Sequence, residues 1–376
     1  MKPIRFGRRI FVGGGSALAA GAALDSLFGP LRSARAAEAP IAVPEIDWLA
    51  VRVVTDSYQI AVAPNAKVGN VDVERFGWGI GDAPPGPTLV SEFGLSLHAE
   101  SRHADQTREV LVDFSFTPGA LTNNLDLLGL DPSKFDALVL SHGHYDHFGG
   151  LSGFLKRYQA KLKAGMPFVY GGEECFCARR WTGPPHPGDF GTIDREALQA
   201  ARLVVTAAEA PMIVADHAFT TGQTPLASFE KVLSPSAMTI GIKGGFGCYV
   251  EKMPEDERSE APIPDKFRHE LATVYNLKGH GLVVLTSCSH RGVVNIVKRA
   301  QDVSGVKKVH AVMGGFHLAP FKEDYVREVI ANLKEIDPDY IVPMHCTGEP
   351  FWDMARAEMP GKLLRAYTGT RFVFRA

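Results

Sequence analysis

LVLSHGHYDHFGG, at residues 138–150, is the stretch from which the fold of this chain is best predicted. A short apolar run leads directly into four side chains of types that bind metal ions: His142, His144, Asp146 and His147. Because one glycine separates the first two histidines, an extended backbone can present both imidazoles on one side. The carboxylate and the third imidazole follow half a turn later and can serve a second ion close to the first. Gly149 and Gly150 permit close backbone approach where a helix over residues 151–163 is predicted to begin.

The density of potential ligands separates this stretch from ordinary uses of histidine. A single histidine is more often a hydrogen-bonded core or surface residue than a metal ligand. Several imidazoles packed together at a buried strand end would repel one another on protonation or would need partners. The pattern H-x-H-x-D-H therefore predicts a metal centre.

Composition allows either one large α/β domain or two smaller ones. The chain has 376 residues, of which 45% are apolar and 22% charged, so it can bury a sizeable core. Its 40 basic and 42 acidic residues leave a formal charge of −2, which argues against nucleic acid or an anionic membrane surface as a partner. We expect a small-molecule substrate and no nucleic acid.

The five cysteines form no dense disulfide framework: Cys175, Cys177, Cys248, Cys288 and Cys346. Only one residue separates the first two, which suits neither a zinc knuckle nor a relaxed disulfide between them. We expect both to be partly buried thiols.

The first 36 residues resemble an export signal. An uncharged Gly- and Ala-rich stretch at residues 10–24 follows several basic residues, and the sequence ARA at residues 34–36 offers a cleavage site. RRIFV at residues 8–12 is similar to the twin-arginine signal, with Gly7 where Ser or Thr is usual. The stretch at residues 10–24 is too short and too rich in small residues to favour a membrane-spanning helix. The alternative is that it remains uncleaved and anchors the protein. We therefore expect the twin-arginine export machinery as a partner, a periplasmic location without a stable membrane span, and a mature domain over residues 37–376.

Strands and helices are predicted to alternate along much of the remaining chain. Residues 48–56, 58–63, 94–98 and 109–114 have the composition of strands, and residues 117–135 resemble a turn, a helix and a second turn. Such alternation predicts a layered α/β architecture.

The middle of the chain, residues 164–235, specifies its structure less clearly. Fragments of strand alternate with aromatic, Gly-rich and Pro-rich segments, whose large side chains could form the wall of a pocket or pack in the core: Phe176, Trp181, His186 and Phe190. Residues 238–251 resemble a pair of strands, and residues 253–270 a charged, Pro-rich surface loop.

Three predicted strands in the last third of the chain run into histidines: residues 281–286 before His290, residues 309–313 before His317, and residues 339–344 before His345. Helices are predicted between them over residues 293–303 and 322–336. Because open α/β sheets place their sites beyond the carboxyl ends of strands, these histidines can converge with those that follow Leu140.

The segments SHGHYDHFGG, TSCSHRGVVNIV, MGGFHL and PMHCTG, in this order and spacing, resemble the metallo-β-lactamase fold superfamily over about residues 47–376. Within it they are similar to the branch that includes the archaeal dihydropterin ribofuranosyl-aminobenzene phosphate synthase. The resemblance implies an αβ/βα sandwich with two metal ions at one edge of the paired sheets. It implies that His142 and His144 bind the first ion, that Asp146 and His147 bind the second, and that His345 completes the second set.

The central part of the pattern departs from the better-known members, so the third ligand of the first ion is less certain from sequence. We prefer His290, with Cys288 and His317 as alternatives that could instead be a strand-end thiol and a pocket-lining histidine. His269 and His280 are also candidates for this ligand, but only because of their distance from Cys288 along the chain. We assign the catalytic roles to Asp146 and His317.

Nitrogen and carboxylate ligands favour zinc, with manganese or iron as alternatives. Our first hypothesis is a hydrolase that uses two divalent ions to activate water against a small ester, lactone, amide or phosphoester. A pterin-type synthase, implied by the resembled branch, and a non-catalytic metal-binding or ligand-binding protein are the alternatives. A serine nucleophile at Ser141 or Ser289 is disfavoured because it would leave the ligand cluster unexplained.

Two predicted helix starts could bind an anion. Thr347 could cap a helix that faces the metals, and Arg291 opens the helix at residue 293 in the same way. Ordinary capping and a solvated arginine are the alternatives.

The export assignment leads to the first prediction. Replacing Arg8 and Arg9 together by lysine should trap the precursor in the cytoplasm, because the twin-arginine pair is the feature on which the assignment rests. Fractionation followed by immunoblotting measures this, and export of the variant at the wild-type level would contradict the assignment.

Overall fold

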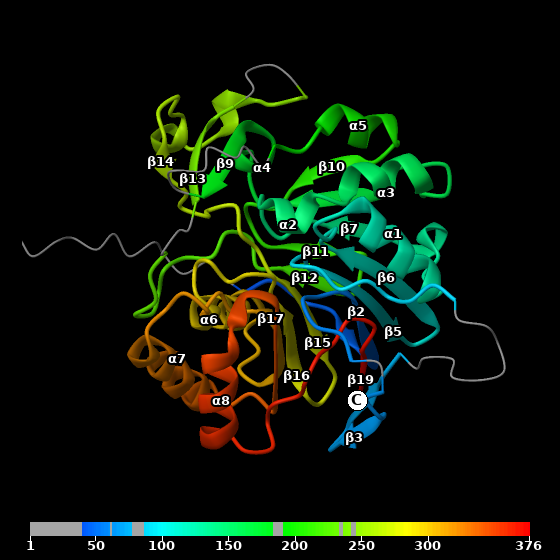
Figure 1. The fold of residues 1–376 in the computed structure, drawn as a ribbon, viewed down its shortest axis with the longest axis vertical. Coiled ribbons are helices and arrows are strands. Elements are labelled where there is room, and N and C mark those ends of the chain that lie inside the picture. The colour runs from blue at the N-terminus through cyan, green and yellow to red at the C-terminus, as the bar shows by residue number, and fades with distance from the viewer. Residues whose placement is uncertain (1–39, 61, 77–85, 183–190, 233–235, 242–245) are drawn as a thin grey trace, which may run out of the picture. The chain divides into compact units, whose positions relative to one another are not determined.

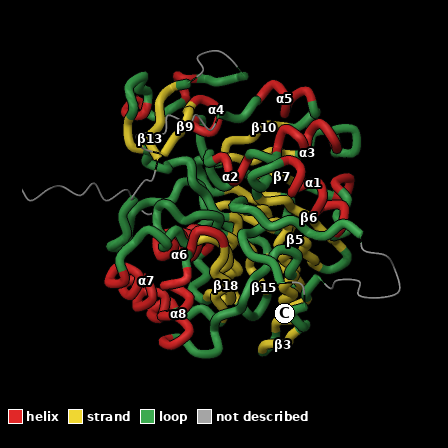
Figure 2. The backbone as a smooth tube through the Cα atoms, in the orientation of Figure 1, coloured by secondary structure: helices red, strands yellow, loops and turns green. Residues whose placement is uncertain are grey.

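The computed structural model describes residues 40–60, 62–76, 86–182, 191–232, 236–241 and 246–376. The predicted export signal, His186 and Phe190 lie outside these residues. Three β-sheets make up the strand framework of the described part, and Figures 1 and 2 show their arrangement.

The first sheet has nine strands in the order β10-β8-β7-β6-β5-β2-β19-β4-β3. In chain order these are β2 (Trp48–Thr55), β3 (Ala66–Val68), β4 (Val71–Glu74), β5 (Ser96–His103), β6 (Gln106–Val112), β7 (Ala137–Val139), β8 (Pro167–Tyr170), β10 (Val204–Ala207) and β19 (Arg371–Arg375). Strands β6, β7, β8 and β10 run parallel, so their carboxyl ends meet at one edge.

The second sheet follows the order β11-β12-β15-β16-β17-β18, with β1 beside β15. Its strands are β1 (Glu45–Ile46), β11 (Met212–Val214), β12 (Ala218–Thr220), β15 (Thr273–Leu277), β16 (Gly281–Leu285), β17 (Val309–Gly315) and β18 (Tyr340–Met344). Strands β16, β17 and β18 are parallel neighbours, which brings the three predicted histidine-bearing ends to one edge. A third, small sheet contains β9 (Ala178–Thr182), β13 (Ser236–Ile240) and β14 (Ile263–Pro264).

Helices cover the outer faces of the two large sheets. The first sheet carries α1 (Pro118–Leu127), α2 (Tyr145–Phe148), α3 (Leu151–Tyr158), α4 (Glu174–Cys177) and α5 (Arg195–Ala200), and the second carries α6 (Val293–Ser304), α7 (Glu323–Ile336) and α8 (Glu349–Glu358). Short 3₁₀ helices connect other elements at Pro132–Lys134, Val250–Lys252, Glu255–Glu257 and His345–Thr347. Among the residues described, no helix is both long and apolar enough to cross a membrane.

Side chains that alternate along the strands build the layers. In β6, Val110 and Val112 belong to the core between the two sheets, whereas Leu111 packs with the helices on the outer face. On the other side, Val326, Val329 and Leu333 of α7 pack with the outer face of the second sheet. The predicted α/β layered sandwich is therefore confirmed.

Most of the predicted strands and helices in the last third of the chain are confirmed, whereas several predictions for earlier segments differ from the structure. The strands before the three C-terminal histidines and helices α6 and α7 form as predicted, while the helix predicted over residues 151–163 ends at Tyr158. Described residues within 58–63 form no strand, and Tyr58, Ile60 and Val62 are exposed rather than paired. Phe176 packs in the core, and Trp181 lies in β9 opposite Ala237.

Of the strand pair predicted at residues 238–251, the first strand is confirmed, because residues 238–240 lie in β13, and the second is wrong, because residues 246–251 form no strand. Strand β13 pairs with β9 and β14 instead, and residues 246–252 form a turn and a 3₁₀ helix. Cys248 forms a disulfide with Cys177, and the Tyr249 amide donates to Glu173 Oε1 at 2.9 Å. These long-range contacts outweigh the local strand preference.

The disulfide also corrects the prediction that Cys177 is a free thiol. Cys175, as expected, stays a free thiol and packs in the core, and Cys288 and Cys346 are likewise free and buried. The bond joins residues 71 positions apart and ties α4 to the segment that follows β13.

We expect loss of this cross-link to destabilise the fold. Replacing Cys177 and Cys248 together by serine should lower the free energy of unfolding by about 2–4 kcal/mol, because the denatured chain is no longer constrained. Urea denaturation measures the change, and reduced wild-type protein should match the variant. Equal midpoints for the variant and the oxidised wild type would contradict the prediction.

Candidate metal centre

The ligand loop begins where β7 ends, and a network of hydrogen bonds fixes its first histidine. The Asp113 carboxylate accepts from the Ser141 amide and from the Ser141 hydroxyl, both at 2.8 Å. The Ser141 hydroxyl oxygen in turn lies 2.9 Å from His142 Nδ1 and, because the hydroxyl donates to Asp113, accepts a hydrogen bond from that ring nitrogen. His142 Nε2, which is buried, has no hydrogen-bond partner among the described residues. The ring is therefore held by its outer nitrogen and offers its inner nitrogen to an ion.

His142, His144 and His290 form one potential ligand set. Each offers a nitrogen within 4.8 Å of the others, and their ring centroids are 4.7–5.0 Å apart. Both ring nitrogens of His290 are buried without a hydrogen-bond partner in the described part of the chain. Orphaned buried nitrogens are costly unless something binds them, so this set fits a metal ion.

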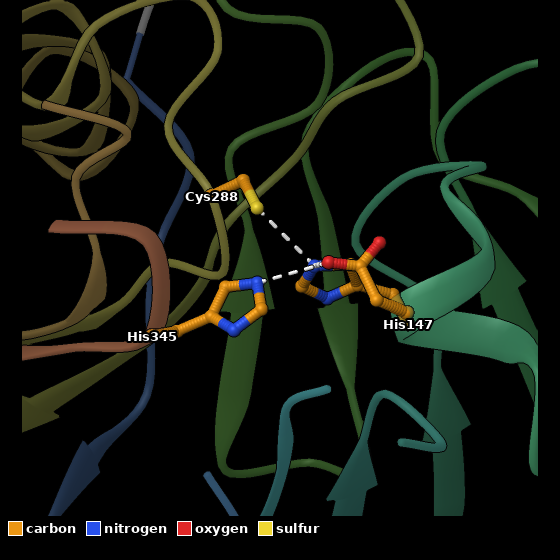
Figure 3. Close-up of side chains that lie close together, drawn as sticks. His147, Cys288 and His345 are labelled. Carbon is orange, nitrogen blue, oxygen red and sulfur yellow. Dashed lines mark hydrogen bonds and ion pairs between the residues drawn. The ribbon is translucent and has the colours of Figure 1, made fainter. Parts of the chain in front are cut away.

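Asp146, His147, Cys288 and His345 form a second set with ligand atoms within 4.8 Å of one another. His147 donates from Nδ1 to Asp113 at 2.7 Å, which leaves Nε2 at 3.2 Å from Cys288 Sγ. His345 Nε2 lies 3.1 Å from Asp146 Oδ2. Figure 3 shows Cys288, His147 and His345 pointing toward one another from different segments.

The structure thus brings together all six residues predicted as metal ligands, in two adjacent groups. Cys288 lies in the second group, whereas His290 lies with His142 and His144 in the first. His317 lies beside both, because Cys288, His290 and His317 form a third overlapping group and the rings of His290 and His317 are 4.2 Å apart. That these residues bind ions remains a prediction.

The three histidines of the first set have lowered pKa values, which favours the form that can bind a cation. Burial and the neighbouring imidazoles lower the pKa values of His142 and His290 well below the ordinary value, and burial lowers the pKa of His144 to about 4. All three rings are therefore neutral near pH 7, which is the form that binds metals.

In the second set, a carboxylate and an imidazole attract one another. Burial opposes ionisation of Asp146, but His147 and His345 hold the pKa of its carboxyl below the usual range. Burial likewise opposes charge on His345, yet Cys346 and Asp146 raise the pKa of its ring to about 9. A divalent cation at this place would displace the proton of His345, so metal binding should release protons.

Arg180, in β9 of the small sheet, forms a hydrogen bond with the ligand loop. Its buried guanidinium pairs with Asp265, donates to the carbonyl of Gly143 at 3.2 Å and contacts His269 Nε2 at 3.2 Å. A side chain on Gly143 would collide with this guanidinium, which explains the glycine between the first two histidines. His269 is therefore held by Arg180 and belongs to none of the ligand groups.

The prediction of a charged surface loop over residues 253–270 is wrong at its end. Asp265, Phe267 and His269 are buried, and Phe267 stacks on His290 with ring centroids 3.8 Å apart. The edge of the same ring meets His144 at 4.9 Å. The loop is held inside because it supplies partners for Arg180 and a flat apolar surface for the imidazoles.

The two helix starts proposed as anion sites do not serve that purpose. Glu230 occupies the start of α6, where its carboxylate accepts from the Asn295 amide at 3.0 Å, and Arg291 donates to backbone carbonyls. Helix α8 is preceded by Gly348, while the Thr347 hydroxyl donates to the Met344 carbonyl at 2.7 Å. Neither assignment is supported.

A cavity of about 330 Å³ opens over the ligand groups. Aromatic side chains line one part of it (Phe93, Phe116 and Tyr145), and Asp146, Cys288, His290 and His317 line its base. Phe93 also stacks on His345, with centroids 4.6 Å apart. The site can therefore bring an apolar group against the metal-binding residues.

Comparison with known proteins agrees with this fold. A family model described as the metallo-beta-lactamase superfamily matches residues 103–170, which include the ligand loop. A metal-dependent hydrolase of the beta-lactamase superfamily superposes with a TM-score of 0.61 at 23% identity, over 86% of this chain and 98% of that one. The chain has the metallo-beta-lactamase fold.

Two archaeal relatives are similar to most of this metallo-beta-lactamase-fold chain. The 7,8-dihydropterin-6-methyl-4-(beta-D-ribofuranosyl)-aminobenzene-5'-phosphate synthase of Methanocaldococcus jannaschii is 27% identical over 282 residues, covering 74% of this chain and 89% of the synthase. An uncharacterized protein of the same organism is 28% identical over 241 residues, covering 64% of this chain and 80% of that protein. The predicted resemblance is confirmed.

Sequence reasoning missed several residues that hold this metallo-beta-lactamase-fold site together. Asp113 is the most important, because its carboxylate supports both His147 and, through Ser141, His142. An aspartate directly after β6, the strand that pairs with β7, was a usable signal. Arg180 and Phe267 carried no such signal, since they reach the site from distant segments.

Asp113 supports a testable prediction. Asp113→Ala should weaken metal binding about 10- to 100-fold, because His147 and Ser141 lose the acceptor that orients them. Competition with a chromophoric chelator measures the affinity. Asp136→Ala, at the other end of β7, is the control, and equal affinities in the two variants would contradict the prediction.

Proposed function

We propose that this chain is a metal-dependent hydrolase with a dinuclear centre, most compatible with zinc. The first ion would be held by His142, His144 and His290, and the second by Asp146, His147, Cys288 and His345. One observation carries the proposal: two ligand groups with orphaned buried nitrogens lie side by side at the base of a largely aromatic cavity. Imidazole, carboxylate and thiolate donors together favour zinc.

Bound there, a pair of divalent ions would polarise a substrate oxygen and activate water as the nucleophile. The residues of the chain have separate tasks. Asp113 and Ser141 hold the tautomers of His147 and His142, so the ligand nitrogens face inward. Phe93, Phe116 and Tyr145 line the cavity and can contact an apolar part of the substrate.

Asp146 and His317 keep the catalytic roles that we assigned to them. The Asp146 side chain is 14% exposed and reaches the cavity between His147 and His345, where its ionised carboxylate can accept a hydrogen bond from water and orient it. His317 enters the cavity with a backbone φ of 46°, an unusual conformation that aims its ring at the space above His290. From there its ring can donate a hydrogen bond to a substrate oxygen or a proton to a leaving group.

The cavity also bears on the substrate class. A volume of about 330 Å³ lies at the small end of the range for ligand pockets. Its lining joins three aromatic rings to the metal-binding base. A small ester, lactone, amide or phosphoester with an apolar substituent fits this arrangement best.

A second candidate function is a synthase reaction on a phosphate-bearing pterin compound. Similarity to the archaeal synthase favours it. So does a groove of about 780 Å³ whose lining includes Lys231, Lys266 and Arg268, the last two of which also pair with Asp256. The product named for that relative carries a phosphate, and cationic side chains are suited to binding it.

We also propose that the protein functions outside the cytoplasm. The Cys177–Cys248 disulfide supports this location, because disulfides persist in oxidising compartments and are rare in the cytoplasm. It agrees with the twin-arginine motif at residues 8–12.

The hydrolase proposal is tested by metal content and activity together. Zinc-loaded wild-type protein should bind two ions and hydrolyse at least one compound in a panel of small esters, lactones, amides and phosphoesters. His142→Ala and Asp146→Ala should each lose chiefly one ion and lower kcat/KM by about 100-fold or more, since each removes a ligand of a different set. His103→Ala, at the exposed end of β5, is the control.

Two outcomes would overturn the proposal. At most one ion in metal-replete wild-type protein would contradict the dinuclear centre. Hydrolysis that survives removal of either ligand would contradict metal-dependent catalysis. Formation of a pterin–aminobenzene ribofuranosyl phosphate product, with no hydrolysis of the panel, would favour the synthase instead.

A further inference from the structure

A second group of potential ligands lies at the opposite end of the same three strands that carry the metal centre. His280 immediately precedes β16, His310 is the second residue of β17, and Asp339 immediately precedes β18. Because β16, β17 and β18 are adjacent and parallel, their amino ends lie together, away from the carboxyl ends that reach the centre. One ligand atom of each residue lies within 4.8 Å of those of the others.

We propose that His280, His310 and Asp339 bind a single zinc ion at a structural site, separate from the catalytic centre. Two imidazoles and a carboxylate form a common set of zinc ligands. This site is independent of the proposed hydrolase function.

The geometry of the three side chains supports the proposal. The rings of His280 and His310 are 4.7 Å apart between centroids and are tilted by 46°, so neither stacks flat on the other. His310 is only 1% exposed and places Nδ1 at 2.7 Å from Asp339 Oδ2. A carboxylate in this position either orients the ring for an ion at the other nitrogen or shares the ion itself.

Asn70 is placed to complete the set from the other large sheet. It lies in the turn between β3 and β4, with its amide nitrogen 3.3 Å from His310 Nε2 and 3.4 Å from both ring nitrogens of His280. Its amide oxygen is 3.2 Å from the Tyr340 hydroxyl. A half-turn of this amide would direct its oxygen at the imidazoles, and the hydroxyl could then accept from the amide nitrogen.

Such a site would join the two sheets of the sandwich at their far end. β3 and β4 form one edge of the first sheet, whereas β16, β17 and β18 belong to the second. The turn that bears Asn70 follows β3, which lies at the lower end of the view in Figure 1. The Tyr340 hydroxyl already links the sheets through its 3.1 Å bond to the Val68 carbonyl. An ion here would add a stronger cross-link to this contact.

The surrounding charges permit a cation. Burial lowers the pKa of His310 despite the opposing effect of Asp339, and His280 and Lys308 act in the same direction as burial, so the ring is neutral near pH 7. Lys308 Nζ lies 3.6 Å from Asp339 Oδ2, but its side chain is 54% exposed and can move into solvent at little cost. Asp339 then supplies a negative charge beside the ion.

Diffraction at the zinc absorption edge tests the proposal directly. Crystals of the wild-type protein are loaded with ZnCl₂ and then equilibrated in zinc-free buffer. We expect an anomalous peak about 2.0–2.1 Å from a ring nitrogen of His280 and of His310. A peak at the catalytic centre without one here would overturn the proposal.

A solution experiment gives an independent result. Chelator-treated protein is reloaded with ZnCl₂, dialysed and assayed for zinc by mass spectrometry. His280→Ala and the milder His280→Gln should each lose one zinc equivalent and retain wild-type hydrolytic activity, because the catalytic centre is untouched. His103→Ala, which removes an exposed histidine at the end of β5 near the Asp47 carboxylate, should lose none. Zinc content in both His280 variants equal to that of the wild type would show that these side chains make only hydrogen bonds.

Discussion

The burial of several imidazoles at one end of the sandwich is the constraint on which the rest of this structure depends. His142 and His147 are fully buried, and His290 is nearly so. Burying polar rings without partners costs free energy, and charging them side by side costs more. The fold limits this cost by giving the outer nitrogens of His142 and His147 a single support, the Asp113 carboxylate, reached directly or through the Ser141 hydroxyl. The inner nitrogens remain available to metal ions, and binding would remove the remaining cost.

These rings come together only when the two large sheets pack on one another. The ligand loop follows β7 of the first sheet, whereas His290, His317 and His345 follow β16, β17 and β18 of the second. The apolar core between the sheets therefore determines the separation of the two halves of the site. Metal binding and the packing of the sandwich should consequently reinforce one another.

Much of this arrangement could be predicted because the sequence signal is local. Each of the four ligand-bearing strands is apolar and ends in a histidine within a few positions, so strand direction alone places the side chains at one edge. The supporting residues could not be predicted in the same way. Phe267 belongs to a segment whose charged, Pro-rich composition is typical of a surface loop, and its burial depends on contacts with His290 and His144. The disulfide partner of Cys177 could not be predicted either, because Cys248 lies 71 positions away in a segment whose residues favour a strand.

The small sheet explains why a buried charged residue stands where an apolar one could fill the space. Replacing a buried ion pair by apolar side chains is often neutral or favourable for stability, so Arg180 and Asp265 need another reason to be there. The contacts of Arg180 supply that reason. Its guanidinium donates to the carbonyl of Gly143, which lies between His142 and His144, and pairs with Asp265, two residues before Phe267. An apolar side chain could pack in the same volume but could not fix the position of that carbonyl. The small sheet therefore sets the spacing between the ligand loop and the ring that stacks on His290, and with it the geometry of the first ligand set.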